Sequence, residues 1–352
     1  MSTDSSEPEA PEACFIPIAD PAHSYLHRPF AWSSDGARLA VAEGPQLRIY
    51  GLGGAQLREF EALGGEPIGE LAWSPCDDRI AVATDGDMIY RHRAAIIDGE
   101  TGERLDFDAE HDARIDDLRW SPTGETIASV GDDLMLWAAG QGTLLRRCLG
   151  DEPVRFSKDG LRVARVHDDF FEILDRVDSG ADRRFERRSS WKHASCWWDV
   201  SEAPSTSAVD LHSDGPRTLM LWGLGELPPF GRTLTWAPDR PLAIAEGDRH
   251  GMLFFQPGEP APRVLDPLHE RTVGAIAWSA DGARIASGGR GRRVLLWSRR
   301  GAATGERPPG MVADPARPTL RGQITELAWA ADGSRLAIRA HGGIQLWTPS
   351  RG

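Results

Sequence analysis

Short apolar runs separated by turn residues recur along the chain. The stretch Val273–Trp297 reads VGAIAWSADGARIASGGRGRRVLLW and holds three such runs, with near-copies at Ile324–Trp347, Ile115–Trp137 and Pro29–Tyr50. The runs do not alternate cleanly between apolar and polar residues, which favours strands that are covered on both faces. No long pattern with a period of 3.6 residues competes with them. The chain is therefore predicted to be all-β and built from repeated units.

Two sets of marker residues count these units. An aromatic residue precedes a Ser/Ala-x-Asp-Gly turn at Trp32, Trp73, Trp120, Phe156, Trp236, Trp278 and Trp329. The third apolar run ends at Tyr50, Ile97, Trp137, Leu174, Trp222, Phe255, Trp297 and Trp347. The second set gives eight units with a mean spacing of about 42 residues, which is typical of β-propeller blades. Seven blades with a large insertion are the alternative, because the fifth unit has Trp197 and Trp198 but no Asp-Gly turn.

The turn between the first and second runs has a consistent chemistry. In SADG at Ser279–Gly282, the Asp side chain is expected to accept hydrogen bonds from the turn backbone, and the Gly to adopt a positive φ angle. The segments WSADGARIASGGRGRRVLLW and WSPTGETIASVGDDLMLW, with AIIDGETGERL, resemble the repeats of WD-repeat β-propellers. The Trp-Asp pair of that family is absent. The Trp residues that end the third run, Trp137, Trp297 and Trp347, are followed by Ala138, Ser298 and Thr348.

The resemblance implies a single closed β-propeller of four-stranded antiparallel blades over residues 13–352. It also implies a structural quartet of His, Ser, Asp and Trp within a blade. In the third unit these are His111, Ser129, Asp132 (or Asp133) and Trp137; in the seventh they are His269, Ser287 and Trp297, with no Asp. Because these residues repeat with the blades, we interpret them as structural rather than as a hydrolase triad.

The two ends of the chain are predicted to have different roles. Residues 1–12 are acidic and rich in Ser and Pro, so we expect a disordered tail. The run CFIPIAD at Cys14–Asp20 is placed to supply the fourth strand of the last blade and so to close the ring.

Charge and motifs restrict the function. A formal net charge of −13 argues against a nucleic-acid partner. The four cysteines have no paired spacing, which favours reduced thiols over disulfides or zinc ligands. No signal peptide or membrane span is expected, so we predict a cytoplasmic protein that does not bind membranes. The sequence contains no phosphate-binding, dinucleotide-binding or catalytic motif, and no cofactor is predicted.

The predicted partner-binding residues lie in loops between second and third runs. The loop Asp85–Arg93 is longer than its counterparts and combines Tyr with Arg, residues enriched at interface hot spots. The full set is Tyr90, Arg91, His92, Arg93, Arg249, His250, Arg290 and Arg292. A metal site formed by a ring of loop histidines is disfavoured, because residues of different blades lie too far apart.

These observations predict a non-enzymatic platform for protein–protein interactions, or a subunit of a multiprotein complex. It would act as a monomeric propeller within a hetero-complex and bind proteins with acidic segments. The alternative is an enzyme or small-ligand receptor that uses the central channel. Glu70, Asp117 and Glu326 occur at strand entries, and we interpret them as scattered residues rather than a carboxylate ring.

Overall fold

The computed structural model describes most of the chain, with gaps that are largest in the middle. The described residues are 13–18, 29–85, 92–150, 154–156, 159–166, 170–175, 183–186, 234–236, 243–246, 252–255, 263–265, 273–290, 294–298 and 321–349. Within them the regular structure is entirely β-strand, and no helix occurs. The all-β prediction is confirmed for this part of the chain.

Strands that follow one another along the chain pair as antiparallel neighbours. The first sheet contains β2 (Phe30–Trp32), β3 (Arg38–Glu43), β4 (Gln46–Gly51) and β5 (Gln56–Glu61). The second contains β6 (Ile68–Trp73), β7 (Arg79–Thr84), β8 (Ala94–Asp98) and β9 (Arg104–Asp106). The third contains β10 (Asp117–Trp120), β11 (Thr126–Val130), β12 (Asp133–Ala138) and β13 (Thr143–Leu149).

The later sheets repeat this order. The fourth contains β14 (Val154–Phe156), β15 (Arg162–Val166), β16 (Phe170–Asp175) and β17 (Arg183–Glu186). Another contains β18 (Leu234–Trp236), β19 (Ala243–Glu246), β20 (Met252–Phe255) and β21 (Arg263–Leu265). A three-stranded sheet follows with β22 (Val273–Trp278), β23 (Arg284–Gly289) and β24 (Val294–Ser298). The last sheet combines β25 (Arg321–Trp329), β26 (Leu336–His341) and β27 (Gly343–Trp347) with β1 (Ala13–Pro17).

The marker residues fall where the sequence predicts. All seven aromatic markers end the first strand of a sheet, and the third strands contain the predicted run ends from Tyr50 to Trp347, Trp222 excepted. The fifth predicted unit, including Trp197, Trp198 and Trp222, lies outside the described residues. The structure thus describes seven sheets consistent with propeller blades.

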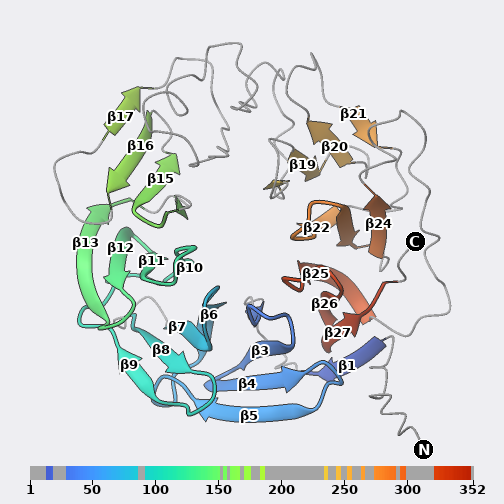
Figure 1. Ribbon diagram of the computed structural model, residues 1–352, viewed down its shortest axis with the longest axis horizontal. Helices are drawn as coiled ribbons and strands as arrows, with labels where there is room; N and C mark the ends of the chain where they lie inside the picture. The colour runs from blue at the N-terminus through green and yellow to red at the C-terminus, as the bar shows by residue number, and fades with distance from the viewer. Residues whose placement is uncertain are drawn as a thin grey trace, which may run out of the picture.

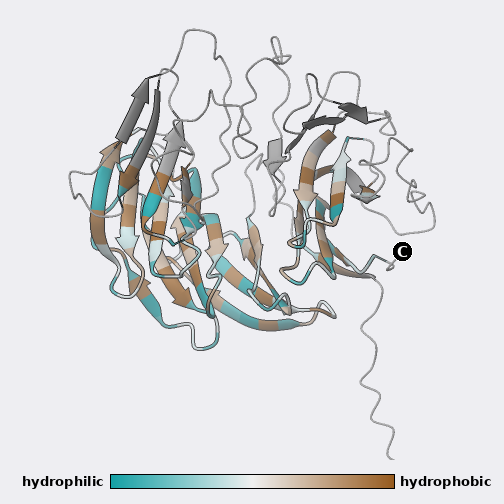
Figure 2. Cartoon of the chain, turned by 45° about the horizontal axis from the view of Figure 1, so that its top comes forward, coloured by the Kyte–Doolittle hydropathy of each residue, from teal (hydrophilic) through white to brown (hydrophobic). Residues whose placement is uncertain are grey.

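Figure 1 shows the sheets following one another around a common centre. First strands such as β10, β22 and β25 lie nearest to that centre, and fourth strands such as β5, β9 and β13 lie at the outside. Hydrophobic positions run through the strands, and the connecting turns are more hydrophilic (Figure 2). This layout places the turns and loops on the two faces and leaves the outer strands at the rim.

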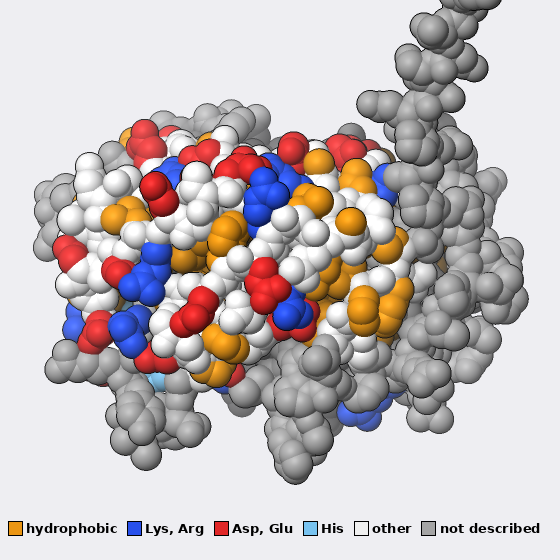
Figure 3. Space-filling model, turned by 90° about the horizontal axis from the view of Figure 1, so that it is seen from below, with side chains coloured by type: hydrophobic (Ala, Val, Ile, Leu, Met, Phe, Trp, Pro, Cys, Tyr) orange, Lys and Arg blue, Asp and Glu red, His pale blue; other side chains and the backbone are white. Residues whose placement is uncertain are grey.

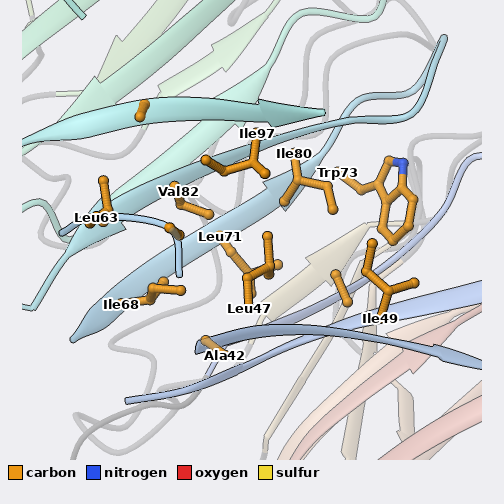
Figure 4. Packing of buried hydrophobic residues seen from close by; sticks show 13 residues of the cluster. Ala42, Leu47, Ile49, Leu63, Ile68, Leu71, Trp73, Ile80, Val82 and Ile97 are labelled. Atoms are coloured by element: carbon orange, nitrogen blue, oxygen red, sulfur yellow. The ribbon is translucent and has the colours of Figure 1, made fainter. Parts of the chain in front are cut away.

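The core consists of apolar layers between neighbouring sheets. Leu47 and Ile49 of the first sheet pack with Leu71, Ile80 and Val82 of the second, and all five are buried (Figure 4). Burying one such side chain fully stabilises the fold by about 1.5–3 kcal/mol. Similar clusters join the second sheet to the third and the third to the fourth. The second and third sheets are therefore covered by a neighbour on each face, which explains why their strands do not alternate.

The first and last sheets are also neighbours. Strand β1 pairs with β27, with Cys14 opposite Leu346 and Ile16 opposite Ile344, as predicted for this N-terminal segment. The indole N–H of Trp32 donates to the carbonyl oxygen of Ala328 at 3.1 Å. An apolar cluster including Phe30, Leu39, Tyr50, Ile344 and Leu346 fills the space between the two sheets.

The predicted turn chemistry is confirmed at several sheets. At Ser279–Arg284, the Asp281 carboxylate accepts a hydrogen bond from the Ser279 hydroxyl at 2.5 Å and another from the Ala283 N–H at 2.9 Å. The Arg284 N–H donates to Ser279 Oγ at 2.9 Å. Gly282 has a φ of 64°, and equivalent positive φ angles occur at Gly36, Gly124, Gly160 and Gly333. Side chain and glycine together close the hairpin between the first two strands.

Candidate functional site

The described turns after β3 and β7 lie on the same face as the connection between the first two sheets. The Arg93 guanidinium, after the second strand of its sheet, contacts Glu66 in the preceding connection at 2.5 Å. The Asp85 N–H donates to the carbonyl oxygen of Pro67. The Ile68 N–H donates to the carbonyl oxygen of Gly44, which lies in the equivalent turn of the first sheet. We call this side, formed by the turns after second strands and the connections between sheets, the loop face.

Three members of the predicted quartet come together in the third sheet. The Trp137 indole N–H donates to Ser129 Oγ at 2.8 Å, and His111 Nε2 lies 2.7 Å from the same oxygen. All three side chains are buried. Because Ser129 Oγ accepts from Trp137, its hydroxyl hydrogen is available to His111 Nε2, which then acts as an acceptor. Burial lowers the pKa of His111 to about 4, so its imidazole is neutral near pH 7.

The aspartate of the quartet does not join this arrangement. His111 Nδ1 is buried and has no hydrogen-bond partner among the described residues. Asp132 is exposed, and Asp133 instead accepts a hydrogen bond from Arg147 Nε. A Cβ built at Gly131 would lie 3.1 Å from His111 Nδ1, so the turn backbone occupies the space beside that nitrogen. In the seventh unit, the Trp297 indole N–H donates to Ser287 Oγ at 2.8 Å, and His269 lies outside the described residues.

His92 was predicted to contact a partner, and this prediction is wrong. Its side chain is fully buried, and its backbone forms an antiparallel bridge with His111 through N–H···O bonds of 3.1 and 3.0 Å. Pairing with the connection before the third sheet draws this residue into the protein, where a partner cannot reach it. The sequence offered no signal for this, because residues 92 and 111 belong to different loops.

Two predicted contact residues are exposed on described parts of the loop face. Arg93 has 52 % of its side chain exposed and is paired with Glu66. Arg290 is exposed in the turn after β23. The remaining predicted residues, Tyr90, Arg91, Arg249, His250 and Arg292, lie outside the described residues.

Other basic side chains on this face are also paired with carboxylates. Arg114 lies 2.6 Å from Asp116, and Arg147 lies 3.0 Å from Asp112. At the rim, Arg48 is paired with Glu43 and Glu59 at 2.8 and 3.3 Å. The view of the rim in Figure 3 shows acidic and basic side chains interspersed, with hydrophobic side chains between them. The described surface on that side has no extended area of a single charge.

A contact that the sequence did not predict, between an Arg and a Trp, joins neighbouring sheets. Arg38 lies over the Trp73 ring at 5.4 Å, Arg79 over Trp120 at 5.0 Å, and Arg284 over Trp329 at 4.6 Å from the ring centroid. In each case the Arg follows the marker Trp of its own sheet by six residues and reaches the marker Trp of the next sheet. That spacing is visible in the sequence, but the stacking of one sheet on the next decides which Trp the Arg contacts.

Backbone hydrogen bonds complete this contact. The Arg79 guanidinium donates to the carbonyl oxygens of Gly124 and Ala139 in the next sheet, both at 2.9 Å. In the opposite direction, the Trp120 indole N–H donates to the carbonyl oxygen of Ala72 at 2.9 Å. Such reciprocal bonds fix the position of one sheet relative to the next, and with it the spacing of their loops.

Three carboxylates on inner strands are also related. Glu70 in β6, Asp117 in β10 and Glu326 in β25 each precede the marker Trp of their strand by three residues. The prediction that they are scattered is wrong, because they hold equivalent positions. Burial, followed by the charges of Asp117 and Glu326, raises the pKa of Glu70 to about 8. Burial raises the pKa of Glu326 to about 7.

The described residues also bear on metals and membranes. Across the described ranges, no group of three or more His, Cys, Asp or Glu side chains is arranged to hold a metal ion. In that same part of the chain, no helix has the length and hydropathy needed to cross a bilayer. Cys14, Cys76 and Cys148 are free thiols, and Cys196 lies outside the described residues.

Comparison with protein families agrees with this arrangement. The family model for the WD domain, G-beta repeat, matches residues 264–298. The matched segment extends from β21 through β24 and includes the Ser279–Arg284 turn and the Trp297–Ser287 hydrogen bond. The match supports assignment of the chain to the WD-repeat family. WD repeats generally mediate protein–protein interactions and are generally non-enzymatic.

Proposed function

We propose that this protein is a closed β-propeller of eight blades that acts as a non-enzymatic platform for binding other proteins. Its loop face holds the partner, either transiently or as a stable subunit of a hetero-complex in the cytoplasm. The fifth blade would come from the chain between β17 and β18. The WD-repeat match at residues 264–298 is the observation that carries the proposal.

The contacts between sheets support a platform role. The Arg–Trp contacts and the apolar layers hold neighbouring sheets in fixed relative positions. Loops anchored on such a scaffold lose little conformational entropy when a partner binds, so more of the contact energy appears as affinity. Arg93 and Arg290 are exposed side chains on this scaffold.

The charge pairs suggest how an acidic partner segment would bind. Arg93 is held by Glu66, and a carboxylate of the partner would compete with Glu66 for the guanidinium. An exposed pair of this kind contributes at most about 1 kcal/mol, so the exchange is inexpensive. The resulting interaction should weaken at high salt concentration, because exposed charges are screened.

Affinity purification of the tagged protein from its own cells, followed by mass spectrometry, tests the proposal. We expect specific proteins to be recovered with the wild type and lost with the double variant Arg93→Ala, Arg290→Ala. The matched control is Arg58→Ala, which removes a half-exposed Arg from the rim. Partners that persist with the double variant and disappear with the control would place the interface at the rim. Recovery of no partner by the folded wild type would contradict the platform function.

The inner carboxylates are the observation that favours the second candidate, a receptor or enzyme that uses the central channel. Metal analysis of the purified protein separates the two candidates. Calcium or zinc bound at one equivalent per chain would favour the channel function, whereas its absence together with captured partners would favour the platform.

A further inference from the structure

Two histidines from different connections form a hydrogen-bonded pair. His92, two residues before β8, and His111, in the connection before β10, donate to each other's carbonyl oxygens at 3.1 and 3.0 Å. Opposite residues of such an antiparallel pair have their Cβ atoms about 5 Å apart and on the same side of the backbone. Both residues are buried, with 0 % and 1 % of their surface exposed. We call these two residues and their two backbone hydrogen bonds the histidine bridge.

The ring of His111 attaches the histidine bridge to the third sheet. His111 Nε2 lies 2.7 Å from Ser129 Oγ, which accepts from the Trp137 indole N–H at 2.8 Å. Among the described residues, neither ring nitrogen of His92 nor Nδ1 of His111 has a hydrogen-bond partner. A Cβ built at Gly131 would lie 3.1 Å from His111 Nδ1, so the turn backbone occupies the space beside that nitrogen. The site therefore suits neutral imidazoles, which need fewer acceptors than charged ones.

Protonation would give the His111 ring two N–H donors in a site with too few acceptors. The added hydrogen on Nε2 would point at Ser129 Oγ and take away the acceptor that the Ser129 hydroxyl hydrogen uses in the neutral state. The Nδ1–H would have no acceptor within the described part of the chain. A buried charge without hydrogen-bond partners is far more costly than a neutral polar group. The protonated ring is therefore more stable in water than in the closed bridge.

The charges around His111 do not compensate for its burial. Burial is the largest effect and lowers the pKa of His111 to about 4. Asp132 and Asp133, at the turn into β12, oppose this shift, whereas Arg147 of β13 and His92 add to it. Because Asp133 is paired with Arg147, their opposite charges largely offset each other at the ring.

We propose that the histidine bridge is an acid-sensitive attachment: protonation of His111 opens it and detaches the residues before β8 from the connection before β10. At neutral pH the two backbone hydrogen bonds hold these segments together. In acid, the His111 ring takes up a proton and leaves Ser129, and the bridge bonds are lost with it. Arg93, the residue after His92, is exposed on the loop face and moves with the opened segment. One part of the loop face thereby responds to acid.

The direction of the pH dependence follows from linkage. A His whose pKa is lower in the closed bridge than in the open one binds fewer protons when the bridge is closed, so acid favours opening. The stabilising effect is complete above the ordinary value of 6.5 and is lost as the pH falls through about 4. With these two values, the ratio of closed to open bridge falls about 30-fold between about pH 7.5 and about pH 5.

Amide hydrogen exchange of the full-length wild type, measured residue by residue by NMR, tests this inference. The His92 and His111 N–H groups report on the bridge directly, because each donates one of its two bonds. Their protection, corrected for the intrinsic exchange rate, should fall about 30-fold from about pH 7.5 to about pH 5. The amides of the strand pair β7–β8 should lose much less protection, because that pairing does not depend on the bridge.

The variant His111→Gln removes the titrating ring. In this variant the protection of the His92 N–H should change with pH no more than that of the β7–β8 amides. The matched control is Glu103→Gln, which removes an exposed carboxyl from the turn before β9 and should keep the wild-type pH dependence. An equal fall in the wild type and in His111→Gln, or a fall shared by the β7–β8 amides, would overturn the inference. Protection of the wild-type bridge that does not change with pH would also overturn it.

If the His111→Gln chain does not fold, imidazole NMR of histidine-labelled wild type decides. The His111 ring should stay neutral at about pH 6 and take up its proton only as the pH falls towards about 4. A ring that titrates at its ordinary value would overturn the inference, because the closed and open bridge would then bind the proton equally. Both measurements use the isolated chain, so their outcome is independent of the proposed partner binding.

Discussion

At the scale of single residues, Ser129 connects two side chains that would otherwise be buried without partners. Its hydroxyl accepts from the Trp137 indole and lies within hydrogen-bond distance of His111 Nε2. Leaving a buried donor or acceptor unsatisfied costs about 1–3 kcal/mol. The hydroxyl is therefore more important for stability than its small size suggests.

Ser129→Ala should lower the free energy of unfolding by about 2 kcal/mol or more, because both neighbours lose their partner at once. Urea denaturation followed by Trp fluorescence measures this change. Ser34→Ala is the matched control, since Ser34 is exposed in the turn after β2. An equally small effect of both substitutions would show that a buried water replaces the hydroxyl.

His92 shows the limit of residue-level prediction. Its position in a long loop next to Tyr and Arg favoured a contact surface, but the bridge to His111 buries it completely. A residue's type and its neighbours along the chain do not specify which distant segment will cover it. Arg93, the next residue, stays exposed because its long side chain extends to Glu66 at the surface.

At the scale of elements, the junction between sheets depends on one Arg from each of several sheets. Arg79 combines the stacking contact on Trp120 with two hydrogen bonds to backbone carbonyls of the next sheet. The planar guanidinium presents several N–H groups in fixed directions, which a lysine cannot reproduce.

Arg79→Ala should destabilise the fold by about 2 kcal/mol, because stacking and two charge-assisted hydrogen bonds are lost together. Arg79→Lys should recover only part of this loss, as it keeps the charge but not the planar group. Thermal denaturation monitored by circular dichroism measures both. Arg58→Ala, which removes an exposed pair with Glu100 and an exposed hydrogen bond to the Leu57 carbonyl, should change stability by less than about 1 kcal/mol. A lysine variant as stable as the wild type would mean that charge alone holds the junction.

At the scale of the whole molecule, β1 brings the start of the chain to its last sheet. Ile16 is fully buried and Ile18 nearly so, and five residue pairs join β1 to β27. Removing this strand would expose an apolar layer and the edge of β27.

Deletion of residues 1–20 should therefore lower the melting temperature by on the order of 10 °C, since it removes both the pairing and the buried isoleucines. Deletion of residues 1–12 should leave the melting temperature unchanged, because β1 begins at Ala13. Scanning calorimetry compares the two truncated chains with the full chain. A large fall in melting temperature after the shorter deletion would contradict the assignment of the stabilising effect to β1.

The sequence by itself determined the strands, their repeat and the turn between the first two strands of each sheet. These features depend on interactions within about 20 residues, where apolar runs, an Asp side chain and a glycine suffice to specify a hairpin. The equivalent positions of Glu70, Asp117 and Glu326, and the Arg six residues after several of the marker Trp residues, were also present in the sequence. The sequence did not show which residues of other sheets these side chains contact.

The tertiary structure alone decided which repeated residues meet. The contacts of Arg79 with Trp120 and of His92 with His111, and the charge interactions of Glu70 with Asp117 and Glu326, all join different sheets or loops. Such contacts arise when apolar layers stack one sheet on the next, and the same stacking removes the water that would otherwise screen charges. Pairing with another loop therefore made His92 a core residue, and burial with neighbouring charges raises the pKa of Glu70.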